Sequence, residues 1–252
     1  MRRGLSALLG LGLALLAFTT AQAKPAYGDW VAIVVAGDWH AHSGGPSEAF
    51  DNARRDVSAE LEKLGFQHDN IRQFSVRPER YPDTKPGKTD LEAVYTGLKD
   101  LSAASPGGCL VYFTTHGAPQ GIVFDDKLLP PDLMGEVIDQ ACPGKPSIVI
   151  ISACFSGVFV PTLSKPDRMI LTAARSDRTS FGCGESDKYP FFDTCFLKEA
   201  PSAHDFISLG TAVQKCVADK ETETGMSPPS EPQLWVGPAL APMLPLYSFP
   251  RR

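Results

Sequence analysis

Continuously apolar, β-branched runs recur along the chain without the polar alternation of a half-exposed strand. They cover residues 29–37, 109–115, 147–152 and 168–174, and residues 71–76 form a further predicted strand. A strand that is apolar at every position needs cover on both faces, which is typical of parallel sheets. Helical patterns separate these runs at the spacing of βαβ units. The sequence therefore predicts an α/β fold of three layers, with a mostly parallel sheet between helices.

Helices are predicted where apolar residues recur every three to four positions between the strands. They cover residues 47–66, 89–104 and 131–142, and a last helix is expected to begin at Ser202. Residues 233–237 read as a final short strand, and the proline-rich tail after it is expected to run over the surface. Because no internal repeat or low-complexity linker divides the chain, one domain is predicted for residues 24–252.

The first 23 residues have the pattern of a secretory signal peptide. Arg2 and Arg3 precede an apolar stretch at residues 5–18, and the small residues "AQA" at 21–23 suit a cleavage site before Lys24. The apolar stretch is shorter than the roughly 20 residues that span a bilayer. The interpretation is a periplasmic or secreted protein with no stable membrane insertion after removal of the signal, and a retained anchor is the alternative.

Charge and cysteine content narrow the classes of function further. The chain has a net charge of −5 and no basic patch, which makes nucleic acid an improbable partner. Its six cysteines suggest disulfides in an exported chain. Cys109 and Cys142 each precede one of two neighbouring predicted strands, so this pair is the first expected bridge. For Cys183, Cys195 and Cys216 a 183–195 and a 195–216 bridge both remain open.

A histidine and a cysteine each follow a predicted buried strand. His116 and Gly117 come after residues 109–115, and Cys154 comes after residues 147–152. In open α/β sheets ligands bind beyond the carboxyl ends of the strands. A cysteine attacks as its thiolate and needs a nearby base, which His116 can be if the two strands are neighbours. The backbone N–H groups of Gly117 and Cys154 are candidates for an oxyanion hole. The competing interpretation is a buried thiol and an unrelated histidine.

The blocks "VYFTTHG" and "ACFSG" resemble the signature of the legumain-type cysteine peptidases, the asparaginyl endopeptidases, whose fold is caspase-like. The resemblance covers about residues 29–237 and includes "AARSDRTSFGC" at 173–183, where that family borders its specificity pocket. It implies a caspase-like three-layer sandwich, a catalytic dyad of His116 and Cys154, a peptide or protein substrate, and no metal or cofactor.

The chain departs from this family after the first strand, where legumain carries an asparagine and an arginine. The corresponding stretch here is "GDWHAHSGG", which has neither. Asp38, Ser180 and Asp193 are therefore the candidates for substrate contact. An acidic pocket without an arginine is expected to accept asparagine or a basic side chain and to reject aspartate, because like charges repel.

A metal site is a second possible interpretation of the same stretch. Asp38, His40 and His42 alternate, and histidine with carboxylate is a common set of zinc ligands. No further ligand follows at a known spacing, so a polar loop at the rim of the site is favoured and no metal is predicted.

The predicted function is that of an exported cysteine endopeptidase that transfers an acyl group through a thioester on Cys154. Two alternatives keep the fold. One is a transpeptidase or ligase that uses the same dyad with an amine as the acceptor. The other is a caspase-like binding domain without turnover. A serine hydrolase is disfavoured because the chain contains no G-x-S-x-G motif.

Overall fold

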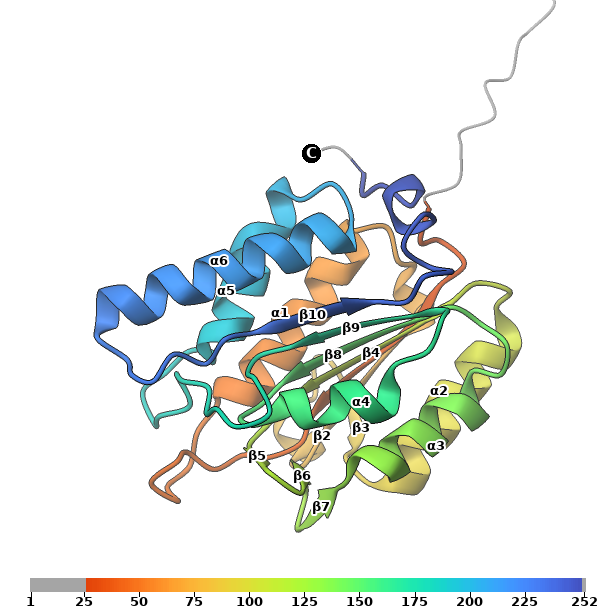
Figure 1. Ribbon diagram of the computed structural model, residues 1–252. Helices are drawn as coiled ribbons and strands as arrows, with labels where there is room; N and C mark the ends of the chain where they lie inside the picture. Colours follow the sequence, from red (N-terminus) through yellow and green to blue (C-terminus); the bar gives the residue numbers. More distant parts are fainter. Residues whose placement is uncertain (1–25, 251–252) are drawn as a thin grey trace, which may run out of the picture.

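A seven-stranded sheet forms the centre of the computed structural model, which describes residues 26–250 (Figure 1). The predicted signal peptide at residues 1–23 lies outside the described residues. The strand order is β10-β9-β8-β4-β1-β2-β3, and all neighbours are parallel except the pair β9–β10. The strands are β1 (Val31–Ala36), β2 (Ile71–Ser75), β3 (Gly87–Lys88), β4 (Cys109–Thr114), β8 (Ser147–Ser152), β9 (Arg168–Thr172) and β10 (Gln233–Val236).

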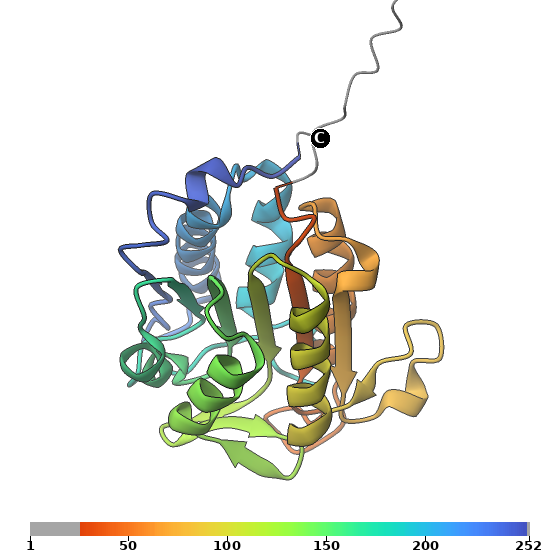
Figure 2. The same cartoon turned by 90° about the vertical axis from the view of Figure 1, so that its right-hand side faces the viewer.

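Helices cover both faces of this sheet, as predicted (Figures 1 and 2). One face is covered by α1 (Ala49–Lys63), α5 (Phe191–Glu199) and α6 (Phe206–Thr224). The other is covered by α2 (Leu91–Ala104), α3 (Pro131–Ala141) and α4 (Phe159–Leu163). Every residue of β1, β4 and β8 is buried, which explains why these strands are apolar throughout. The fold is thus a three-layer α/β sandwich.

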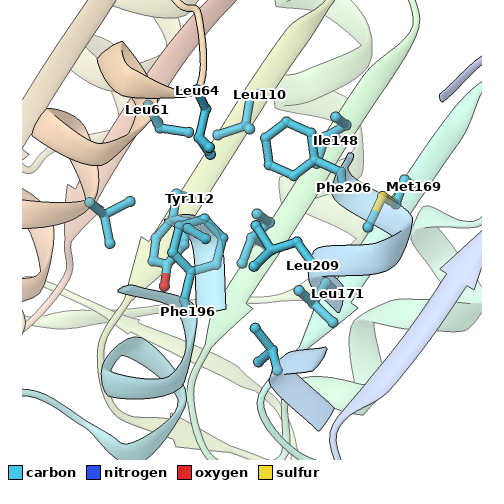
Figure 3. Packing of buried hydrophobic residues seen from close by; sticks show 14 of the residues in the cluster. Leu61, Leu64, Leu110, Tyr112, Ile148, Met169, Leu171, Phe196, Phe206 and Leu209 are labelled. Carbon is cyan, nitrogen blue, oxygen red and sulfur yellow. The ribbon is translucent and has the colours of Figure 1, made fainter. Parts of the chain in front are cut away.

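The two layers of core are packed by aromatic and branched side chains. Figure 3 shows Tyr112 of β4 against Phe196 of α5, whose ring centroids are 5.3 Å apart. Removing such apolar surface from water is the main favourable term in folding, at about 25 cal/mol per Å². The central strands β4 and β8 lie between the two layers and contribute buried side chains to both.

The chain that follows His116 forms a second, three-stranded sheet. It consists of β5 (Gly117–Ala118), β6 (Gly121–Phe124) and β7 (Lys127–Leu129). The turn between β6 and β7 has Asp125 in the left-handed region, with φ 58°. This small sheet is connected to β1 because the N–H of Asp125 donates to the carbonyl of Gly37 at 2.8 Å.

The structure differs from the sequence-based expectation in the C-terminal third. The last helix begins at Phe206 rather than at Ser202, because Asp205 is its N-cap and accepts from the N–H of Ser208 at 2.7 Å. Helix α5 was not predicted. The tail does not simply run over the surface: its apolar residues Leu240, Leu244 and Phe249 are buried in the same core as α6.

Two disulfides cross-link the fold. The predicted Cys109–Cys142 bridge is confirmed, and it joins the start of β4 to the end of α3. The second bridge is Cys195–Cys216, one of the two pairings left open, and it joins α5 to α6. Two disulfides indicate an oxidising compartment. No helix among residues 26–250 is long and apolar enough to cross a membrane.

Candidate active site

The candidate site lies where β1, β4 and β8 end. Strands β4 and β8 are neighbours in the sheet, and their last residues, Thr114 and Ser152, are register partners. His116 and Cys154 each follow two residues later. The segments are in direct contact, because a Cβ on Gly117 would lie only 2.0 Å from the carbonyl oxygen of Cys154. Only glycine allows this approach.

A turn after β1 positions the histidine. The carboxylate of Asp38 accepts from the N–H groups of Trp39 and His40 at 2.6 and 3.0 Å, and its Oδ1 lies 2.7 Å from Nδ1 of His40. This turn directs the carbonyl of His40 at Nε2 of His116, 3.0 Å away. The side chain of Asp38 is 8 % exposed and bonds its own turn, so its effect on His116 comes through the position of the His40 carbonyl. The structure does not place Asp38 in the wall of the pocket beside Cys154.

The hydrogen bond to His40 selects one tautomer of His116. A carbonyl oxygen only accepts, so Nε2 carries the proton and Nδ1 of the neutral ring keeps its lone pair. The ring also packs edge-on against Phe50, with centroids 5.0 Å apart. Burial lowers the pKa of His116, and the nearby charge of Asp38 opposes this shift. His116 therefore favours its neutral form at neutral pH, with Nδ1 as the basic nitrogen.

A strained turn presents the cysteine. Phe155 follows Cys154 with φ 57°, a left-handed conformation that is uncommon for a bulky residue. Its N–H donates to the carbonyl of Arg178 at 2.8 Å. The sulfur of Cys154 accepts from the N–H of Ser180 at 3.2 Å. A backbone donor aimed at the sulfur stabilises negative charge there, as a nucleophilic cysteine requires.

A pocket of about 320 Å³ opens beside Cys154. Most of its wall comes from the loop after β9, so the predicted contact of Ser180 with this site is consistent with the geometry. The lining residues are His42, Cys154, Thr179, Ser180, Phe181, Gly182, Cys183, Gly184 and Asp187. Hollows of about 380 and 480 Å³ lie elsewhere on the surface, and neither is lined by a cysteine.

Cys183 is the second free thiol of the described chain and lines the same pocket. Burial, and to a smaller extent repulsion between its thiolate and that of the neighbouring Cys154, raise the pKa of Cys183 to about 11. Cys183 is thus a protonated, weakly nucleophilic thiol at neutral pH.

Asp187 is a pocket residue that the sequence did not single out. One of its carboxylate oxygens accepts from the N–H of Gly184 at 2.7 Å, and its side chain lines the pocket together with His42. The stretch "GESDK" reads as an ordinary charged loop, so only the course of the chain reveals which acid faces the pocket. No arginine or lysine is among the lining residues.

The expectation that Asp193 contacts substrate is not met. Its carboxylate is fully buried in the first turn of α5, where hydroxyl groups of β4 and β8 donate to it. The metal interpretation of Asp38, His40 and His42 finds no support either. Asp38 is engaged by its own turn, and no cluster of three such ligands occurs within residues 26–250.

A three-layer α/β sandwich with a free cysteine and a histidine after neighbouring strands defines the class of caspase-like cysteine peptidases. A sequence profile described as the peptidase C13 family matches residues 86–221, more than half of the chain. The chain belongs to the peptidase C13 family, the legumain-type cysteine peptidases. The matched region includes His116, Cys154 and the pocket loop.

The fold is also similar to that of a solved caspase. Caspase-1 from Spodoptera frugiperda is 18 % identical, with a TM-score of 0.61 over 85 % of this chain and 89 % of that one. At this identity the likeness shows the fold alone. No curated protein sequence matches the chain at a significant level.

Proposed function

We propose that this chain is an exported endopeptidase that cleaves peptide bonds through a thioester on Cys154, with His116 as its partner in proton transfer. The observation that supports this most is the pairing of β4 with β8, whose last residues Thr114 and Ser152 are register partners. The chain segments that carry His116 and Cys154 therefore leave the sheet side by side at one rim. A nucleophile and its base need this proximity.

In the proposed reaction the thiol of Cys154 gives its proton to Nδ1 of His116, because Nε2 is engaged by His40. The thiolate attacks the substrate carbonyl, and the N–H groups of Gly117 and Cys154 stabilise the oxyanion. Collapse of this intermediate breaks the C–N bond, and His116 gives its proton to the departing amine. Water then hydrolyses the thioester and releases the acid, which regenerates the thiol.

The pocket beside Cys154 is proposed to hold the substrate side chain that precedes the cleaved bond. Asp187, Thr179 and Ser180 are polar residues of its wall on the loop after β9, and the wall has no arginine or lysine. Such a pocket favours a neutral polar side chain such as asparagine, or a basic one, and repels aspartate. Asp187 thus takes the role in substrate contact that the sequence suggests for Asp193.

Export is supported by the leader pattern at residues 1–23 and by the two disulfides, which need an oxidising compartment. A periplasmic or secreted location is consistent with both observations. Detecting the chain in the periplasmic or culture fraction with Lys24 at its N-terminus supports export, whereas a cytoplasmic chain with Met1 retained argues against it.

A peptide-library digest of the chain from Lys24 onward tests the proposed activity. Cleavage after asparagine or basic residues is expected, with loss of activity in Cys154→Ala and His116→Ala. His68→Ala, a change at an exposed histidine outside the site, is the matched control. Full activity of Cys154→Ala contradicts the mechanism. Capture of an added amine in place of water indicates the transpeptidase alternative, and no turnover under any condition favours a binding domain.

A further inference from the structure

Asp193 lies below the candidate site with its whole side chain buried, at 0 % exposure. Three hydroxyl groups donate to its carboxylate. Tyr112 and Ser152 do so at 2.6 and 2.7 Å, and Thr114 at 3.0 Å. Among the residues described, no arginine, lysine or histidine pairs with it. An isolated buried charge is costly, so hydrogen bonds alone must stabilise this one.

The three donors come from the two strands that lead into the candidate dyad. Tyr112 and Thr114 belong to β4, and Ser152 belongs to β8. Thr114 and Ser152 are register partners, and both of their hydroxyls bond the same oxygen, Oδ2 of Asp193. One carboxylate oxygen therefore bridges the last residues of β4 and β8, two residues before His116 and Cys154.

Burying the charged carboxylate of Asp193 lowers the stability of the folded chain. Burial raises the pKa of Asp193 to about 6, although hydrogen bonds from Tyr112, Ser152 and Thr114 lower it. Tyr112 is the titratable group that faces this carboxylate, and burial and Asp193 raise its own pKa. An uncharged side chain of the same shape avoids this cost. A buried carboxylate without a cation is often kept for function rather than for stability.

We propose that Asp193 is a positioning residue that holds the ends of β4 and β8 at the separation that aligns His116 with Cys154. The carboxylate accepts hydrogen bonds from both strands at once, so their ends cannot shift independently. This inference rests on the proposed function, because it presupposes that His116 and Cys154 work together. Asp193 itself touches no substrate.

Asp193→Asn tests the proposal with little change of shape. The amide has one acceptor oxygen and one donor nitrogen, so it cannot accept from all three hydroxyls of β4 and β8 as the carboxylate does. A misplacement of about 1 Å can cost roughly 100-fold in rate. We expect kcat to fall by at least about ten-fold with KM within about two-fold, while the melting temperature at pH 7.5 stays the same or rises.

Thr172→Val is the matched control. Thr172 ends the next strand, β9, and is also a fully buried hydroxyl, but it donates to the carbonyl of Ala174 rather than to Asp193. We expect wild-type kcat in this variant. Ser152→Ala is a second probe that removes one of the bridging donors, and a smaller loss of kcat is expected there.

Alkylation of Cys154 by iodoacetamide gives a readout that needs no substrate. If His116 is aligned, its neutral Nδ1 takes the proton of the thiol as Cys154 attacks, so alkylation is faster than that of an ordinary thiol and its rate follows the titration of His116. In Asp193→Asn we expect the pH profile of this rate to move toward that of a free cysteine, while Thr172→Val keeps the wild-type profile. Because this experiment reports on alignment alone, it remains decisive if no peptide is cleaved.

Two results overturn the proposal. One is a wild-type kcat and a wild-type alkylation profile in Asp193→Asn. The other is an equal loss of kcat in Thr172→Val together with a lower melting temperature. That result means that losing any buried hydroxyl bond near these strand ends lowers activity through stability. By contrast, full peptidase activity in Cys154→Ala contradicts the proposed function and leaves the alkylation profile to decide the role of Asp193.

Discussion

Burial sets the protonation of individual side chains around the rim, and it favours the neutral form of each. It lowers the pKa of His116 and raises that of Cys183 to about 11. At neutral pH the neutral imidazole of His116 and the protonated thiol of Cys183 are therefore the favoured forms at this rim. The proposed nucleophile Cys154 accepts a hydrogen bond from the backbone N–H of Ser180, whereas Cys183 is desolvated by burial.

Asp193 predicts a pH dependence of stability. Its pKa rises from 3.8 to about 6 on folding, so its stabilising contribution is complete below pH 3.8 and is lost as the pH rises through 6. Replacing it with asparagine removes this loss. The difference in unfolding free energy between Asp193→Asn and wild type should grow in favour of the variant by about 2 kcal/mol from pH 4 to pH 7.5. Denaturant unfolding at both pH values measures it, and a difference that does not change with pH contradicts the account.

Asp187 predicts a change of specificity. Asp187→Asn removes the negative charge of the pocket wall, so cleavage after lysine and arginine should fall by about ten-fold relative to cleavage after asparagine. The peptide-library profile measures this ratio. Glu185→Gln is the control, because Glu185 is an exposed acid of the same loop that bonds Ser43 and does not line the pocket. An unchanged ratio in Asp187→Asn means that the pocket does not bind the substrate side chain.

At the scale of elements, the Cys195–Cys216 bridge joins the short helix α5 to the longer α6. The cysteines are 21 positions apart, and a loop of this length corresponds to about 3 kcal/mol of stability. The double variant Cys195→Ala/Cys216→Ala should lose about that amount in denaturant unfolding. With dithiothreitol present, wild type and variant should converge, and a difference that persists after reduction points to packing instead.

The elements that the sequence predicted well are those with a strong apolar pattern. Strands β4 and β8 are apolar at nearly every position, so their bounds were predicted to within a residue. Helix α5 was missed because "FFDTCFLKE" is short: Phe192, Cys195 and Phe196 share one face, but they cover little more than one helical turn. Its position depends on packing against Tyr112 and on a disulfide, and neither can be read from local sequence. The buried tail was missed for the same reason, since its prolines indicate a loop.

At the scale of the whole molecule, the sequence predicts the location of the candidate site better than it predicts which residues line the pocket. Both His116 and Cys154 follow buried strands, and parallel strands end at one edge, so their common rim could be deduced. Which acid reaches the pocket depends on the path of the loop after β9. Asp187 and Asp193 lie six positions apart, yet Asp187 lines the pocket and Asp193 is buried between α5 and the strands β4 and β8.

Covalent labelling with a peptidyl electrophile that carries asparagine tests the central claim, that Cys154 is the nucleophile and His116 its partner, most directly. Intact mass and peptide mapping of the labelled chain should show one adduct, on Cys154, with Cys183 unmodified. Labelling should be much slower in His116→Ala and unchanged in His68→Ala. An adduct on Cys183 instead of Cys154, or equal labelling of both thiols, contradicts the account.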